Sequence, residues 1–273
     1  MPELPEVETV KETLKNVVLN KVIKNVDVYY DNIIACPSSD LFIKNLIDKK
    51  ISNIERKGKW LIFDLGNTCL LSHLRMEGKY FIRSKDDDKL KHEHVRFTFS
   101  DNDSLRYIDT RKFGKMYLVD KSTMYSIKPL SDLGKEPFDE TLNIIYLKDK
   151  YKNKKLPIKT VLLDQSIITG IGNIYADEIL FLCKINPYTK CNLLTNNNLE
   201  DIIKYTKVVL NNAIIQGGST IRSYSSSEGV HGLFQNELLV HTKENEKCTI
   251  CSTKIIKVKI NGRGTYLCPN CQK

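Results

Sequence analysis

The sequence lacks long apolar runs, and it contains no stretch of about 18 consecutive apolar residues. This absence excludes a membrane-spanning helix from the predicted structure. The opening residues, MPELPEVETV, include neither a basic stretch nor an apolar one, so we expect no secretory signal peptide. No internal repeat is found, so a repeat architecture is not expected.

Acidic residues are scarce relative to basic ones. The 273 residues include 42 Lys and Arg against 33 Asp and Glu, which gives a net charge of +9, and residues 248–273 contain five Lys or Arg and no acid at all. This balance favours nucleic acid or an anionic surface as the partner. The length predicts about two domains, and a hydrophobic content of 41% is enough to form their cores.

Four cysteines form the strongest local pattern. Cys248-x2-Cys251 and Cys268-x2-Cys271 are separated by sixteen residues, a spacing typical of a four-thiolate zinc site. Residues 254–260 are predicted to form a strand, 261–264 its turn, and 265–267 the returning strand. A cationic hairpin with an arginine at its tip suits a polyanion, and a purely structural zinc ribbon is the alternative.

The other four cysteines are scattered through apolar surroundings: Cys36, Cys69, Cys183 and Cys191. They are expected to be reduced thiols of a protein in a reducing compartment.

The patterning along the chain changes from strands to helices. A helix should start near Pro5, because Leu4, Val7, Val10 and Leu14 recur at helical spacing. Residues 17–119 are then predicted to form mainly short antiparallel strands, interrupted by a helix over 40–48. Helices are predicted over Thr160–Ile168, Ile174–Cys183 and Leu199–Gln216, with a Gly- and Ser-rich loop over 219–232.

These elements predict an α+β fold in four parts. Residues 1–135 form an N-terminal antiparallel β-sandwich with an N-terminal helix. Residues 136–155 form a lysine-rich linker, since a run of lysines is usually a solvated segment. Residues 156–235 form a helical domain, and residues 236–273 form the zinc hairpin.

The N-terminus is acidic within a basic protein, through Glu3, Glu6, Glu8 and Glu12. These acids complement the positive end of a helix dipole, which is the ordinary explanation. A second interpretation starts from removal of the initiator methionine, which would leave Pro2 with a free secondary amine. An α-amino group has a pKa of roughly 8, so part of it is free base at neutral pH and can attack an aldehyde carbon to form an iminium. Glu3 would lie beside it as a proton donor or acceptor.

Several motifs, in this order, resemble the formamidopyrimidine-DNA glycosylase family. They are the opening MPELPEVETV, Arg56–Lys59, His73–Met76, Asp109-x-Arg111-x-Phe113-Gly114, Gly170-x-Gly172-Asn173-Ile174-Tyr175, and the terminal cysteines with Gly262-Arg263-Gly264. The resemblance covers most of the chain. The related endonuclease VIII branch typically has glycine where this chain has Leu4.

The resemblance implies a catalytic set. Pro2 is similar to the nucleophile that attacks C1′ of the damaged nucleotide, and Glu3 to the carboxylate that transfers protons at the sugar. Glu6 matches a carboxylate that supports the same site. Lys57 matches a lysine of the β-elimination step, and Arg263 matches the hairpin arginine that grips phosphates and assists δ-elimination.

The resemblance also implies DNA contacts. Gly170–Asn173 matches the family's helix–two-turn–helix, and Met76, Arg111 and Phe113 are similar to the residues that fill the gap left by an everted nucleotide. The further expected contacts are His92, Lys154, Lys159, Asn173, Thr220, Arg222 and Tyr224.

The function implied is a base-excision repair glycosylase for 8-oxoguanine and formamidopyrimidines, with lyase activity at abasic sites by β,δ-elimination. One structural Zn²⁺ per chain is expected, and no redox or nucleotide cofactor. The expected partner is double-stranded DNA carrying oxidised bases or abasic sites, bound by a monomer in the bacterial cytoplasm at the nucleoid. Two alternatives remain open, an endonuclease VIII-like enzyme for oxidised pyrimidines and a non-enzymatic zinc-ribbon module that binds DNA.

Overall fold

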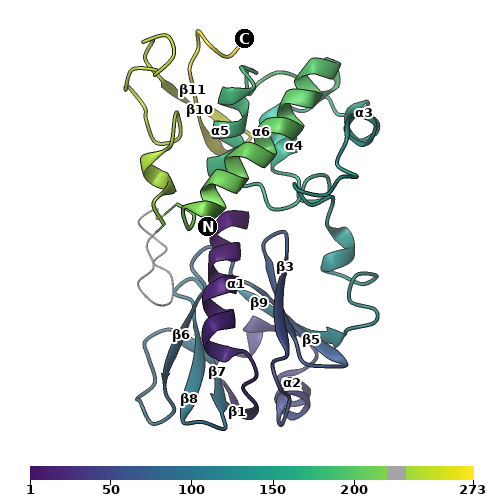
Figure 1. Cartoon of the computed structure of the whole chain (residues 1–273), viewed down its shortest axis with the longest axis vertical. Coiled ribbons are helices and arrows are strands. Elements are labelled where there is room, and N and C mark those ends of the chain that lie inside the picture. The colour runs from purple at the N-terminus through teal and green to yellow at the C-terminus, as the bar shows by residue number, and fades with distance from the viewer. Residues whose placement is uncertain (220–231) are drawn as a thin grey trace. The chain divides into compact units, whose positions relative to one another are not determined.

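The computed structural model describes residues 1–219 and 232–273, and these form two compact units. Unit 1 comprises Met1–Ser131 with the described ends of Gly217–Gly232 (Figure 1). Unit 2 comprises Asp132–Gln216 and Leu233–Lys273. Across the described residues, no helix has the length and apolar character needed to cross a membrane.

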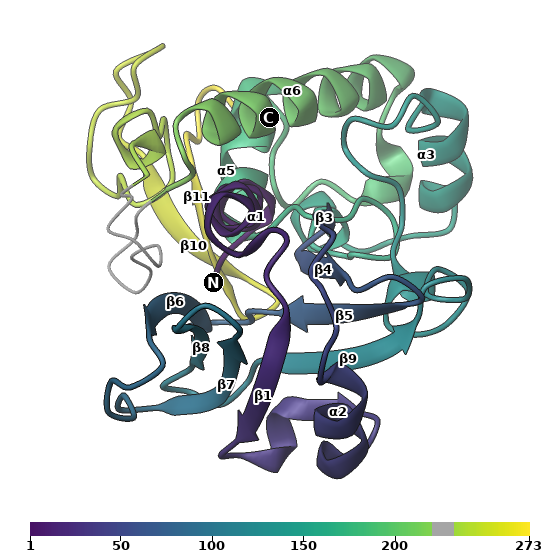
Figure 2. The same ribbon diagram turned by 60° about the horizontal axis from the view of Figure 1, so that its bottom comes forward.

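Unit 1 contains two sheets and a long N-terminal helix, which confirms the predicted fold class. One sheet has the order β2-β9-β5-β4-β3, and Figure 2 shows its strands β3, β4, β5 and β9 side by side. The other has the order β1-β7-β8-β6. All strand pairs are antiparallel except β2 with β9. The elements of this unit are α1 (Leu4–Val18), β1 (Ile23–Val28), η1 (Asp31–Ile33), β2 (Ile34–Cys36), α2 (Ser39–Leu46), β3 (Asn53–Lys57), β4 (Trp60–Asp64), β5 (Thr68–His73), β6 (Lys79–Ser84), β7 (Glu93–Phe99), β8 (Asp103–Ile108), β9 (Lys115–Asp120) and η2 (Leu130–Asp132).

Helix α1 forms where the apolar spacing predicts it. Leu4, Val7, Val10 and Leu14 are all buried, and most of this stripe belongs to the same hydrophobic core as the inward side chains of the sheets. Pro5 stands in the first turn, where the missing N–H has no intrahelical partner to lose. The helix therefore anchors the first residues of the chain against a rigid core.

Unit 2 contains four helices, two short 3₁₀ segments and the C-terminal hairpin, in which β10 pairs with β11 from Ile256↔Leu267 to Ile260↔Arg263. Its elements are α3 (Ile144–Tyr151), α4 (Ile158–Leu162), α5 (Asn173–Leu182), η3 (Cys191–Leu193), α6 (Asn196–Ile215), η4 (Phe234–Asn236), β10 (Ile256–Ile260) and β11 (Arg263–Leu267). Helix α5 packs on α4, α6 and β11.

One predicted helix differs from the structure, and one helix forms where none was predicted. The helix predicted over Thr160–Ile168 ends at Leu162, because the Asp164 carboxylate accepts hydrogen bonds from the N–H (3.0 Å) and hydroxyl (2.6 Å) of Ser166 and closes a local turn. Within the segment predicted as a linker, α3 forms instead. Its start is capped by the Asn143 side chain, which accepts from the N–H of Tyr146 at 3.0 Å.

Candidate active site

The N-terminal residues of α1 are buried acids and a buried proline. Pro2 is buried, and the Glu3 and Glu6 side chains are only 2% and 4% exposed. The N–H of Glu3 donates to Glu6 Oε2 at 2.8 Å, so the two acids are held together at the helix start. Negative charge is favourable there because the helix N-terminus carries partial positive charge. The structure thus places two predicted catalytic residues, Pro2 and Glu3, beside the predicted supporting residue Glu6.

Glu6 also binds the segment that follows α6. Its Oε1 accepts hydrogen bonds from the N–H (2.8 Å) and hydroxyl (3.1 Å) of Ser219. Gly218 has φ +80°, and a Cβ on it would lie 2.8 Å from Glu6 Oε1, so glycine is required for this close approach. Thr220, Arg222 and Tyr224 lie outside the described residues.

Met1 precedes Pro2 in the sequence and is 40% exposed. While Met1 is attached, the Pro2 nitrogen belongs to a peptide bond and cannot act as an amine nucleophile. Removal of Met1 therefore remains a condition of the predicted chemistry.

The turn between β3 and β4 carries Lys57 and Lys59, and Arg56 fixes its position. Arg56 fixes the turn by donating from Nε to Glu8 Oε2 (2.7 Å) and from Nη1 to the carbonyl of Gly58 (2.9 Å). Burial works to raise the pKa of Glu8, but hydrogen bonds from Lys11 and Arg56 outweigh it, and the pKa falls below its ordinary value. This ion pair ties the turn to α1.

The two lysines of this turn differ in exposure. Lys57, the predicted catalytic lysine, is half-buried, whereas Lys59 is 5% exposed. A buried lysine loses hydration of its ammonium group, which makes it a better candidate for proton transfer. The sequence alone did not distinguish Lys59 from Lys57, because both stand in the same basic motif.

Met76 stands in the turn after β5. His73 Nδ1 accepts the N–H of Arg75 at 3.0 Å, and the N–H of Gly78 donates to the carbonyl of Leu74 at 2.9 Å. Burial, assisted by the charges of Arg75 and Lys59, lowers the pKa of His73 to about 3. The imidazole is therefore neutral at physiological pH, and a neutral ring can accept the Arg75 hydrogen bond.

The other two predicted gap-filling residues lie on the exposed turn between β8 and β9. The Arg111 guanidinium carbon is 4.8 Å from the Phe113 ring centroid, and Phe113 is 49% exposed. An exposed aromatic with a cation over its face is available for stacking on a base.

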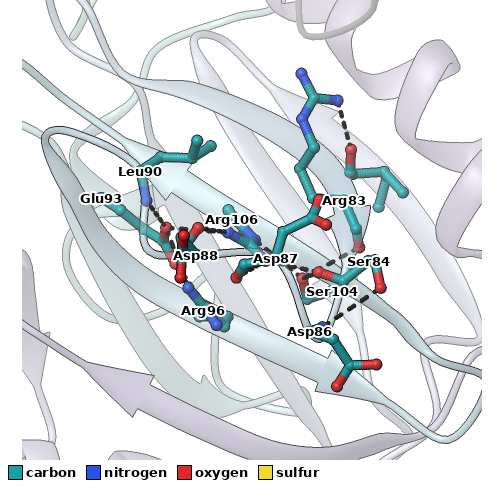
Figure 3. Close-up of polar contacts among 11 residues, drawn as sticks. Arg83, Ser84, Asp86, Asp87, Asp88, Leu90, Glu93, Arg96, Ser104 and Arg106 are labelled. Carbon is teal, nitrogen blue, oxygen red and sulfur yellow. Dashed lines mark hydrogen bonds and ion pairs between the residues drawn. The ribbon is translucent and has the colours of Figure 1, made fainter.

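His92 follows a segment that is fixed by a buried arginine (Figure 3). Arg106 is fully buried and donates to the carbonyls of Ser84 (2.6 Å), Asp87 (2.9 Å) and Asp88 (2.6 Å). Its Nη1 also lies 3.5 Å from Glu93 Oε2, which accepts the N–H of Leu90 at 2.7 Å. The loop before His92 is therefore held by charged hydrogen bonds from the sheet.

In unit 2, two turns precede α5. Gln165 accepts the N–H of Gly170 (2.9 Å) and donates to the carbonyl of Ile171 (2.8 Å), while Gly170 has φ +94°. Helix α5 begins at Asn173, whose Nδ2 donates to the carbonyl of Gly264 at 2.9 Å. The start of this helix is thereby joined to the C-terminal hairpin.

Lys159, a predicted DNA contact, is fully buried. Its ammonium pairs with Asp177 Oδ1, and Asp177 Oδ2 lies 2.7 Å from His241 Nδ1. In this conformation Lys159 supports the helices and does not present its charge at the surface. Lys154 is half-buried, with Nζ 3.4 Å from Asp164 Oδ2. Both DNA contacts remain predictions.

The four terminal cysteines converge. Their sulfurs all lie within 4.8 Å of one another, including Cys248–Cys271 at 3.9 Å and Cys251–Cys268 at 3.4 Å. A tetrahedral site with Zn–S bonds of about 2.3 Å requires sulfurs about 3.8 Å apart, so this cluster fits zinc. Arg263 begins β11 beside the turn at Asn261-Gly262 and is exposed.

Three family profiles match successive parts of the chain. The formamidopyrimidine-DNA glycosylase N-terminal domain matches residues 1–116, and the formamidopyrimidine-DNA glycosylase H2TH domain matches residues 133–225. The zinc finger found in FPG and IleRS matches residues 245–273. The chain belongs to the formamidopyrimidine-DNA glycosylase family.

Relatives in this family match over the full length. The formamidopyrimidine-DNA glycosylase of Oceanobacillus iheyensis is 46% identical over 273 residues, covering 100% of this chain and 98% of its own. That of Listeria monocytogenes is 42% identical with complete coverage of both chains. The match spans the enzyme's N-terminal domain as well as the zinc finger, so a zinc-ribbon module alone does not describe this chain.

Solved glycosylases of the family share the whole fold. The Lactococcus lactis Fpg bound to abasic-site DNA has a TM-score of 0.93 and 38% identity, covering 99% of each chain. The same protein bound to DNA containing N7-benzyl-Fapy-dG has a TM-score of 0.93, and the match covers 100% of each chain.

The match to the family's zinc finger and the converging cysteine sulfurs together establish one structural zinc.

Proposed function

We propose that this chain is a base-excision repair glycosylase that removes oxidised purines, 8-oxoguanine and formamidopyrimidines, and then cleaves the abasic site. The observation that carries the proposal is the buried N-terminal site, in which Pro2, Glu3 and Glu6 lie together at the start of α1. The full-length kinship with named glycosylases supports the same substrate class.

After removal of Met1, the Pro2 nitrogen attacks C1′ of the damaged nucleotide, and the glycosidic bond breaks as the base leaves with its electron pair and a proton. Glu3 exchanges protons at the sugar. Ring opening gives an iminium between Pro2 and C1′. The iminium acidifies the C2′ proton, whose loss expels the 3′ phosphate, and a second elimination expels the 5′ phosphate.

Two cationic groups assist these eliminations. An amine of the β3–β4 turn transfers protons, and it is Lys57 by family resemblance or Lys59 by its burial. The exposed Arg263 binds phosphate through its forked guanidinium. The zinc holds the hairpin that carries Arg263, and four thiolates leave no coordination position for water.

The protein acts on duplex DNA as a monomer, in the bacterial cytoplasm at the nucleoid. Its positive charge makes phosphate contacts the main source of affinity, so binding should fall steeply with added salt. The expected DNA contacts are His92, Lys154 and Asn173, with Met76, Arg111 and Phe113 filling the gap left by the everted nucleotide. Lys159, which is buried against Asp177, is expected to support the helices that carry these contacts.

Borohydride trapping on an abasic duplex tests the proposal. The wild-type protein, shown by intact mass to lack Met1, should form a covalent adduct that peptide mapping places at Pro2. Pro2→Gly should lose excision of 8-oxoguanine, whereas the matched control Pro5→Ala should keep both adduct and excision. No adduct from correctly processed protein would refute the lyase chemistry, and faster excision of thymine glycol than of 8-oxoguanine would favour the endonuclease VIII-like alternative.

A further inference from the structure

Asp109 lies directly after β8 and is fully buried. Its carboxylate accepts three backbone N–H groups of the turn that follows. Oδ1 accepts from Arg111 at 3.0 Å, and Oδ2 accepts from Phe113 at 2.9 Å and Gly114 at 2.8 Å. One buried charge therefore fixes almost the whole turn that presents Arg111 and Phe113.

The backbone of Asp109 holds a second segment. Its N–H donates to the carbonyl of His92 at 3.1 Å, and its carbonyl lies 2.8 Å from His94 Nε2. The residue thus connects the Arg111–Phe113 turn to the start of β7, where His92 stands.

The turn needs such support because its conformation is unfavourable and its surface is open. Lys112 has φ +58°, a region that residues with a side chain rarely adopt, and Phe113 is exposed. A Cβ on Gly114 would lie 1.7 Å from the Tyr107 hydroxyl oxygen, so only glycine fits at this end of the turn.

We propose that Asp109 is a positioning residue that presets Arg111 and Phe113 to fill the gap left by an everted nucleotide. The inference rests on the proposed function, in which these two side chains enter the duplex. Asp109 itself touches no substrate. It acts by holding the turn in one conformation before DNA binds, so that binding does not have to order it.

Asp109→Asn tests this proposal with little change in shape. An amide has one oxygen, so it cannot accept at both carboxylate positions, and its NH₂ would face backbone N–H groups. We expect kcat/KM on duplex 8-oxoguanine to fall about 100-fold, the scale of a misplacement of about 1 Å. Trapping on a single-stranded abasic oligonucleotide should be unchanged, because that substrate has no opposing strand and no gap to fill.

Asp120→Asn is the matched control. Asp120 ends β9 and accepts the N–H of Ser122 at 2.8 Å in another exposed turn, so its variant should leave both activities unchanged. Full duplex activity of Asp109→Asn would overturn the proposal. Parallel loss of duplex and single-strand activities, with a lowered Tm, would also overturn it by assigning Asp109 to the fold alone.

A measurement on the wild-type protein does not depend on the variant folding. Hydrogen exchange should show protected amides at Arg111, Phe113 and Gly114, and unprotected amides there would refute the preset turn. Absence of any adduct from the wild-type protein would instead refute the proposed function.

Discussion

His73 should make unit 1 sensitive to mild acid. Burial lowers its pKa from an ordinary value of 6.5 to about 3. The unfolded chain therefore binds a proton below about pH 6.5 that the folded chain does not. A histidine with a depressed folded pKa contributes its full stability above the unfolded pKa, and that stability is lost as the pH falls from 6.5 towards 3.

The size of the effect follows from these two values. Between about pH 7.5 and about pH 5, protonation of His73 in the unfolded state should lower the free energy of unfolding by about 2 kcal/mol. His73→Asn should lack this contribution. Its side-chain oxygen can replace Nδ1 as the acceptor for the Arg75 N–H, which His73 binds at 3.0 Å, but it does not titrate.

The assay is urea unfolding followed by tryptophan fluorescence. Trp60 is the only tryptophan in the sequence, and its ring centroid lies 4.7 Å from that of His73, so the signal reports unit 1. Carboxyl groups that titrate near pH 5 are shared by both proteins and cancel in the comparison. If the two proteins lose stability in parallel, within about 0.5 kcal/mol, His73 titrates normally in the folded state and the reasoning fails.

Three further outcomes are expected. The Glu178 carboxylate accepts hydrogen bonds from the backbone N–H groups of residues 239–241 at 2.8–3.0 Å. Glu178→Leu should therefore lower the free energy of unfolding of unit 2 by at least about 3 kcal/mol, because each unsatisfied N–H costs about 1–3 kcal/mol. A thermal melt with an unchanged Tm would contradict this. Cys251→Ser should lose the zinc in metal analysis and weaken DNA binding, while the urea unfolding of unit 1 stays the same. In single-turnover elimination at an abasic site, the rate of Lys59→Ala should be about 100-fold lower than that of Lys57→Ala, because the buried Lys59 is expected to be the proton-transfer group. The reverse order of rates would favour Lys57.

The sequence predicted those elements whose apolar pattern has one buried face. Helix α1 follows this rule, whereas strands such as β4 carry runs of apolar residues that are buried on both faces. The hairpin was predicted because the cysteine spacing restrains it from both ends. The helix predicted over Thr160–Ile168 failed because the turn at Asp164 depends on one side chain bonding to the backbone, which periodicity does not detect. Helix α3 was hidden by its lysines, which occupy its solvated face.

The residues of the candidate site differ in how far the sequence indicates them. Residues expected to act through their own chemistry, such as Pro2 and the zinc cysteines, carry a motif. Residues that act through burial do not. Lys57 and Lys59 stand two positions apart in one basic motif, and only the tertiary structure distinguishes a half-buried lysine from a buried one.

Strand β8 shows why the residues that support the loops cannot be predicted from the alternation of apolar and polar residues along a strand. Leu105 and Tyr107 belong to the hydrophobic core, so the pattern predicts that Arg106 faces solvent. It is fully buried instead, because the loop over 84–90 covers the other face of the strand and supplies carbonyls that match the guanidinium. Neither the loop nor the arginine has an apolar signature, and burial of each becomes favourable only when the other is present.

Asp109 depends on its neighbours in the same way. Its carboxylate is hydrogen-bonded by N–H groups of a turn that the carboxylate itself stabilises. Such reciprocal pairs fix the loops expected to reach DNA, so substitutions there should reduce activity on duplex substrates while leaving the chemistry proposed for Pro2 intact.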